Sequence, residues 1–189
     1  MILYATKFKI GFFYNYMINY QFIITLITLD LITYFMHIAY HKIPFMWKLH
    51  KLHHSDPSMN VTTAFRFHIG ELALSMFIKS IVIILLGIRL EHFLLYETIF
   101  LANVMFHHSN LSIGKLDKIY RISFTSPDMH KVHHSNIQIE TDSNYTSLLS
   151  VWDRIFKTYR RKNPNKVIFG IKGLENEKTL DKMLLTPLK

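Results

Sequence analysis

The stretch FIITLITLDLITYFMHIAYH, from Phe22 to His41, joins a long apolar run to two histidines at its end. A helix needs about 20 residues to cross a hydrocarbon core of about 30 Å, so this stretch predicts a membrane-spanning helix over residues 21–41. His37 and His41 are four residues apart, and residues at that spacing lie on one helical face. The predicted helix therefore presents two imidazoles to one ion at its end.

Two further apolar stretches follow, LALSMFIKSIVIILLG at residues 72–87 and FLLYETIFLANVMF at residues 93–106. Gly87 is the breaker between them, so we expect a membrane helical hairpin over residues 71–107. Residues 1–20 are rich in aromatic side chains and lack the pattern of a signal peptide, so we expect them to lie at the membrane interface.

These crossings place residues 41–71 and 107–189 on one side of the membrane. That side is rich in Lys and Arg, which predicts that it is cytoplasmic. Eleven of the twelve histidines fall on or near it, and His92 falls opposite. We expect one all-α domain over residues 1–189, an integral membrane helical bundle whose cytosolic cap and tail, residues 108–189, help to hold a histidine-rich site.

The composition narrows the function further. Lys and Arg number 22 against 13 Asp and Glu, in a chain of which half is hydrophobic. This balance suits a membrane protein with a cationic face, and no nucleic-acid-binding signature is present. Cysteine is absent, which excludes disulfides, thiolate metal sites and cysteine nucleophiles.

A histidine triplet occurs twice, in HKLHHS at residues 50–55 and in HKVHHS at residues 130–135. The i, i+3, i+4 spacing places each triplet on one helical face. Imidazole is a suitable ligand for iron, zinc, copper or nickel. One such motif alone can be a solvated face, but two matched copies with His37 and His41 offer eight nitrogens. Because one ion cannot use eight, we expect two metal ions.

Five segments together resemble the fatty acid hydroxylase / sterol desaturase superfamily: DLITYFMHIAYH, WKLHKLHHSD, FHHSNL, PDMHKVHHS and NYTSLLSVWDRIFKTY. The resemblance runs from about Asp30 to Tyr159. It implies a helical membrane domain with a histidine-bound dinuclear site, generally taken as di-iron, on the cytosolic face. It also implies O2-dependent attack on a lipid C–H bond, giving hydroxylation or desaturation.

The resemblance also implies the metal ligands. A further ligand is expected after the last membrane helix, where His108 is preferred over its neighbour His107. His68 is expected to support the site rather than bind metal. The residues expected to bind metal through the three motifs are His37, His41, His50, His53, His54, His130, His133 and His134.

Asp30, Tyr34 and His37 share one face of the first predicted helix. A carboxylate inside a membrane is costly and usually functional, so we expect Asp30 to orient a histidine N–H. A polar contact between helices is the alternative. Lys79 lies within the second apolar stretch and is expected to extend to the interface without a catalytic role.

Near the C-terminus, Asp153 is expected either to pair with Arg154 or another base, or to hold a histidine. Asn144 and Tyr145 are expected to form a loop that packs over the site.

The cofactors expected are two iron ions, with zinc as a substitute in isolated protein, and O2 as co-substrate. Zinc cannot change valence, so it could not support the reaction. The expected partners are a lipid substrate, membrane lipids and an external electron donor, which is a reductase, cytochrome or ferredoxin. Two alternatives remain: a non-catalytic membrane protein that stores, senses or carries metal, and an inactive homologue.

Overall fold

The computed structural model describes residues 10–12, 20–174 and 179–188, and in this part of the chain the regular elements are helices. The described residues form two isolated β-bridges and no strand. The predicted all-α class is therefore confirmed. The prediction for residues 1–20 lies almost entirely outside the described residues. The elements are α2 (Gln21–Lys42), α3 (Pro44–His54), η1 (Val61–Phe65), α4 (Ile69–Leu86), α5 (Leu90–His108), η2 (Gly114–Leu116), α6 (Asp117–Ser123), α7 (Pro127–His133), α8 (Gln138–Thr141), α9 (Val151–Ile155), η3 (Pro164–Lys166), α10 (Leu180–Leu185) and η4 (Thr186–Leu188).

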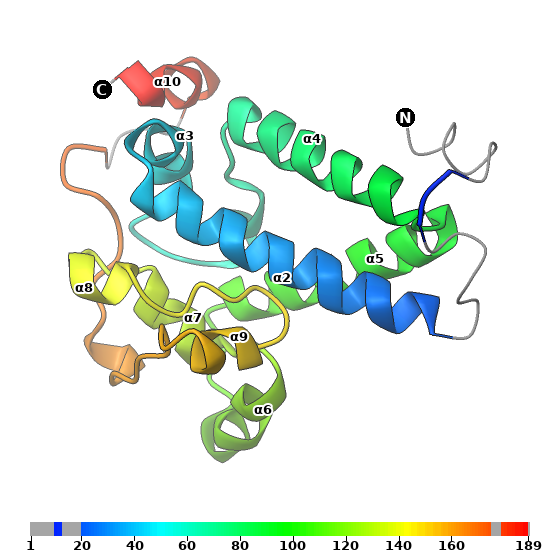
Figure 1. Cartoon of the computed structure of the whole chain (residues 1–189). Coiled ribbons are helices and arrows are strands. Elements are labelled where there is room, and N and C mark those ends of the chain that lie inside the picture. Colours follow the sequence, from blue (N-terminus) through cyan, green and yellow to red (C-terminus); the bar gives the residue numbers. More distant parts are fainter. Residues whose placement is uncertain (1–9, 13–19, 175–178, 189) are drawn as a thin grey trace.

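Helix α2 is the central element and extends one residue beyond the predicted span. Figure 1 shows it crossing the molecule between α4 on one side and the short helices α7 and α9 on the other. Its buried Leu29 packs into an apolar core with Ile83 of α4 and with Phe93 and Tyr96 of α5. This core holds the three long helices together at the end opposite the histidines.

The turn between α4 and α5 lies where the sequence predicted it. Gly87 adopts a left-handed conformation with φ of 70°, and Ile88 N donates to Ile83 O at 3.0 Å. A side chain at Gly87 would be strained in this conformation, which explains why glycine ends the helix. From this turn α4 and α5 diverge toward the histidine-bearing end of the molecule (Figure 1).

Two helices in the described part of the chain, α2 and α4, are long and apolar enough to cross a membrane. Only 17% of the apolar window of α4 is buried, which is unlike the core helix of a soluble protein. Its exposed side chains include Phe77 and Leu85. This uncovered apolar surface fits a helix that faces lipid. Helix α5, which carries Glu91 and Glu97, is not one of the two candidate membrane-spanning helices.

The shorter helices begin at residues suited to helix N-termini. Pro44 and Pro127 occupy the first turns of α3 and α7, where the missing N–H is not needed. Ser126 also caps α7, because its hydroxyl accepts from Met129 N at 3.2 Å. These local signals fix where α3 and α7, the two helices that carry the histidine triplets, begin.

The prediction that Lys79 extends to the membrane interface is wrong. Its side chain is 8% exposed, and Nζ donates to Glu97 Oε1 of α5 at 2.7 Å. The ammonium group also lies 4.8 Å from the centre of the Phe100 ring. A charge partner on the neighbouring helix therefore holds Lys79 inside the molecule.

Candidate metal centre

Nine buried histidines form two groups, and in each group the nitrogen atoms that could bind metal lie within 4.8 Å of one another. No carboxylate belongs to either group. The first group is His37, His41, His50, His54 and His133, and the second is His53, His108, His130 and His134.

Each histidine triplet divides between the two groups. From α3, His50 and His54 belong to the first group and His53 to the second. From α7, His133 belongs to the first group and His130 to the second. His134, the residue after α7, also belongs to the second group. The groups therefore adjoin, and the His54 and His134 rings stack with centroids 4.4 Å apart. The repeated spacing allows one short helix to contribute to both groups.

Hydrogen bonds to the outer nitrogens fix the orientation of four rings. In the first group, the Nδ1 atoms of His37 and His133 donate to the carbonyl oxygens of Tyr145 and Ser143, at 2.6 and 2.8 Å. A carbonyl can only accept, so the proton lies on Nδ1. The lone pair of Nε2 is then available to a metal ion.

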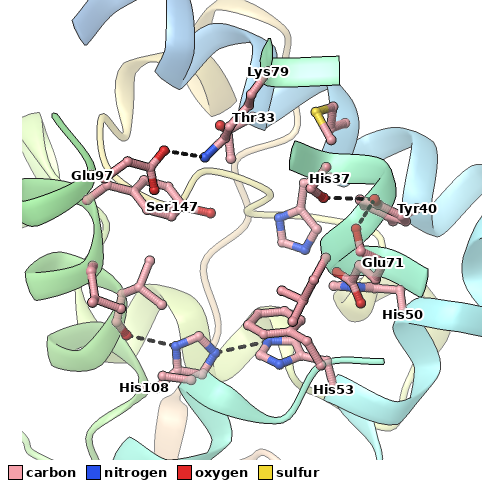
Figure 2. Close-up of a pocket in the computed structure, with 18 of the residues that line it drawn as sticks. Thr33, His37, Tyr40, His50, His53, Glu71, Lys79, Glu97, His108 and Ser147 are labelled. Carbon is pink, nitrogen blue, oxygen red and sulfur yellow. Dashed lines mark hydrogen bonds and ion pairs between the residues drawn. The ribbon is translucent and has the colours of Figure 1, made fainter. Parts of the chain in front are cut away.

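The other two oriented rings lie one in each group. Nδ1 of His50 donates to Glu71 Oε1 at 2.7 Å, in the first group. Nδ1 of His108 donates to Val104 O at 2.8 Å, in the second. Figure 2 shows His50, Glu71 and His108 in the wall of a cavity. Glu71 was not predicted from the sequence, although it directly follows the FRFHIG segment that contains His68.

The spacing of the inner nitrogens matches that of ligands around a metal ion. His108 Nε2 lies 3.1 Å from His53 Nε2 and 3.0 Å from His130 Nε2. In the first group, the Nε2 atoms of His50 and His54 are 3.2 Å apart. With metal–nitrogen bonds of about 2.1 Å, neighbouring ligands are separated by about 3.0–3.4 Å. These residues therefore fit a first-row transition metal.

Several inner nitrogens have no hydrogen-bond partner in the described part of the chain, notably Nε2 of His37, His41 and His133. Nδ1 of His41 lies 3.6 Å from Asp142 Oδ1. Buried polar atoms are normally paired, since an unpaired one costs about 1–3 kcal/mol. A cation between the rings would satisfy several of these lone pairs at once.

Burial favours the neutral form of five of these histidines. It lowers the pKa of His133 to about 3. Burial first, and then the neighbouring imidazoles, also hold the pKa values of His53, His54, His130 and His134 well below the usual histidine value. Neutral imidazole is the form that binds metal, so the site is prepared for a cation at neutral pH.

His107 is buried beside the second group but does not belong to it. Its ring lies 3.9 Å from that of His130, and the Asn103 amide donates to its Nδ1 at 3.4 Å. Of the two adjacent histidines, His108 is therefore the one placed with its nitrogen among the candidate ligands. His68 instead caps α4, because its Nδ1 accepts from Gly70 N at 3.0 Å.

Asp30 does not orient a histidine, contrary to the prediction. Its Oδ2 accepts from Trp152 Nε1 at 2.8 Å and from Leu149 N at 3.1 Å. The alternative, a polar contact between elements, is what the structure shows: Asp30 fastens α9 and the preceding loop to α2. Tyr34 has a similar role, since its hydroxyl lies 2.7 Å from Thr158 Oγ1.

Asp153 neither pairs with Arg154 nor contacts a histidine. Its two oxygens accept from the backbone N–H groups of Tyr145 and Thr146, at 2.8 and 3.2 Å. This contact holds the segment whose Tyr145 carbonyl accepts from His37. The acidic residue therefore acts on the histidines through the backbone, which spacing alone could not reveal.

Asn144 fixes the same loop. It is fully buried with φ of 52°, a left-handed conformation that asparagine tolerates. Its Nδ2 donates to Met129 O of α7 and to Arg160 O. The next residue, Tyr145, packs its ring 5.2 Å from His41. The loop thus covers the first group on the side of α7.

A cavity of about 230 Å³ adjoins both groups. His37 and His50 of the first group and His53, His108 and His130 of the second line it. Most of the remaining wall is apolar and comes from α2, α4 and α5 (Figure 2). The arrangement can present an apolar molecule to metal ions held by both groups.

Comparison with known proteins identifies the family of the chain. The family model described as fatty acid hydroxylase matches residues 22–158. The chain is 29% identical to the ornithine lipid hydroxylase OlsE of Rhizobium tropici over 157 residues, which cover 82% of this chain and 46% of that protein. It is 30% identical to human alkylglycerol monooxygenase over 143 residues, which cover 73% of this chain and 30% of that protein.

The chain thus spans less than half the length of these relatives. No solved structure matches it significantly. The family match covers well over half of the chain and includes all nine histidines of the two groups. The chain therefore belongs to the fatty acid hydroxylase family.

Proposed function

We propose that this protein hydroxylates an unactivated C–H bond of a membrane lipid, using O2 and a di-iron centre held by the two histidine groups. The observation that carries the proposal is a pair of adjoining, buried, all-nitrogen groups that line one apolar cavity. Both relatives are named for the addition of oxygen to lipids, which favours hydroxylation over desaturation.

Two iron ions, when bound, would supply the change of valence and the binding of O2 that oxidation of a hydrocarbon requires. The ligands would be the nine histidines of the two groups. The protein's own contribution is to fix the rings. The outer N–H groups of four rings donate hydrogen bonds to the carbonyls of Tyr145, Ser143 and Val104 and to the Glu71 carboxylate. The lone pairs of the inner nitrogens therefore converge.

The cavity is placed to receive a lipid from the membrane. Leu72 and Met76 of α4 and Leu101 of α5 line it and are also more than 40% exposed. Residues with both properties form the rim of an opening, and this rim is apolar. We infer that a lipid chain enters sideways between the diverging α4 and α5.

Apolar and aromatic packing also keeps water from the histidines. The Phe67 ring stacks on His53 with centroids 4.5 Å apart, and Tyr40 stacks on His50 at 5.5 Å. Both residues line the cavity. Exclusion of water favours reaction with the lipid over loss of oxidising equivalents to solvent.

The overall reaction requires a reductant. The lipid and O2, with two electrons and two protons, would yield the hydroxylated lipid and water. We propose that an external reductase, cytochrome or ferredoxin supplies the electrons. We also propose that the metal centre lies on the cytoplasmic side, because Lys and Arg gather in the segments that share its side.

Lipid mass spectrometry of cells grown under oxygen-18 tests the function. Cells expressing the chain should contain a lipid that carries one labelled oxygen, and cells expressing His133→Ala should lack it. If the wild-type chain binds iron and no lipid gains the label, the protein binds metal without turnover. If neither iron nor label is found, it is an inactive homologue. Either result would refute the proposal.

A further inference from the structure

The cavity wall contains an ion pair that the metal centre does not use. Lys79 of α4 and Glu97 of α5 both line the cavity, and their charged atoms are 2.7 Å apart. In Figure 2 this pair stands at the upper edge of the cavity, and His53 and His108 stand at the lower edge. A molecule in the cavity could therefore contact the pair at one end and the histidines at the other.

Stability does not readily explain the pair. Lys79 lies near the middle of an apolar helix that is expected to cross the membrane, and its side chain is 8% exposed. Desolvation of a buried ion pair offsets most of the attraction, and an apolar pair of similar size is often as stable. Charged residues at such depth usually mark a functional site.

The pair retains hydrogen-bonding capacity. An ammonium group has three donors and a carboxylate accepts about four hydrogen bonds, whereas one hydrogen bond joins Lys79 to Glu97 in the structure. The ammonium nitrogen lies 4.8 Å from the centre of the Phe100 ring and 5.6 Å from that of Tyr96. An aromatic ring is a weaker hydrogen-bond acceptor than an oxygen atom. Lys79 and Glu97 both line the cavity, so a polar group there could accept a hydrogen bond from Lys79 and donate one to Glu97.

We propose that the Lys79–Glu97 pair binds the polar group of the lipid substrate, and that this group is an uncharged donor and acceptor such as a hydroxyl or an amide. The proposal rests on the proposed lipid hydroxylation and names its substrate class. A free carboxylate would be disfavoured, because the charge of Lys79 is already balanced and Glu97 would repel a second anion. The pair would thereby set which carbon of the chain reaches the histidines.

Equilibrium binding to the full chain in detergent, without iron, tests this. The probes are radiolabelled hexadecylglycerol and ionised hexadecanoic acid, which share a chain length and differ in the polar group. The wild type should prefer hexadecylglycerol. Glu97→Gln leaves the charge of Lys79 unbalanced, so preference should move toward the acid by at least about tenfold, the scale of one hydrogen bond to a charged group. Glu91→Gln, an exposed change on the same helix, should alter neither affinity.

A purely structural pair predicts a different result, because Glu97→Gln would then weaken both lipids equally or leave both unchanged. Either outcome overturns the proposal. If Glu97→Gln does not fold, the neutral double variant Lys79→Met with Glu97→Gln decides: loss of preference between the probes supports the proposal, and an unchanged preference refutes it. Since binding is read without iron, the outcome does not depend on whether the protein oxidises lipid.

Discussion

Replacement of Glu71 by glutamine should weaken one metal site and spare the other. Glu71 Oε1 accepts from His50 Nδ1 at 2.7 Å, and both side chains are at most 5% exposed. His50 belongs to the first histidine group, whereas the second group contains no ring that contacts Glu71 in the described structure. The amide of glutamine lacks the charge that polarises the imidazole, so the His50 nitrogen becomes a poorer ligand.

The size of the effect follows from the contact. Removal of an outer carboxylate that orients a metal-bound histidine typically lowers metal affinity by about 10- to 100-fold, or roughly 1.4–2.7 kcal/mol. Here the carboxylate touches one ligand of five in its group. We therefore expect the loss to fall near the lower end of that range and to be confined to the first site.

Titration of the metal-free protein with Co²⁺ measures this, because each site should give its own step in visible absorption or calorimetry. Wild type should show two ions per chain. Glu71→Gln should shift one step toward weaker binding and leave the other in place. Glu91→Gln, at an exposed glutamate of α5, is the matched control. Equal weakening of both steps, or no change in either, would refute the division into two groups.

Three further predictions follow from the same contacts. Asp30→Asn should lower the free energy of unfolding by about 1–3 kcal/mol, since it weakens two buried hydrogen bonds, yet keep two metal ions per chain. Loss of metal with unchanged thermal stability would contradict this. His108→Ala should remove metal from the second group, whereas His107→Ala should retain it; metal analysis that gives the reverse would assign the ligand to His107. Because burial lowers the pKa of His133 to about 3, only the unfolded chain gains a proton there between about pH 6.5 and pH 3. The free energy of unfolding of metal-free protein should therefore fall as pH is lowered below about 6.5, by up to about 1.4 kcal/mol per unit per such histidine; chemical denaturation at several pH values that shows a constant or rising stability would contradict it.

Local features of the sequence predicted much of the architecture. The apolar stretch that ends in His37 and His41 gave a helix whose observed end lies at Lys42. Gly87 marked the turn between α4 and α5 because only glycine adopts its left-handed conformation without strain. These properties depend on a few neighbouring residues, so no tertiary information was needed.

The contacts around the histidines depended on which distant segments pack together. Asp30 shares a helical face with His37, yet it accepts a hydrogen bond from Trp152, which is 122 residues further along the chain. Glu71 contacts His50 only because the start of α4 packs against α3. Motif spacing shows which residues share a face, but it does not show what lies opposite that face.

The division of each triplet between two groups was equally hidden. His53 and His54 are adjacent in sequence and belong to different groups. The i, i+3, i+4 pattern is compatible with three ligands to one ion or with a division between two. The positions of α2, α5 and α7 around α3 decide between these, and they arise from packing of the whole bundle.

The number of iron ions bound by anaerobically purified protein, with their magnetic coupling, shows whether the two histidine groups form a dinuclear centre. We expect two iron ions per chain at saturation, with Mössbauer spectra that show coupling between them. One ion per chain, or two ions without coupling, would contradict a dinuclear centre formed by adjoining histidine groups.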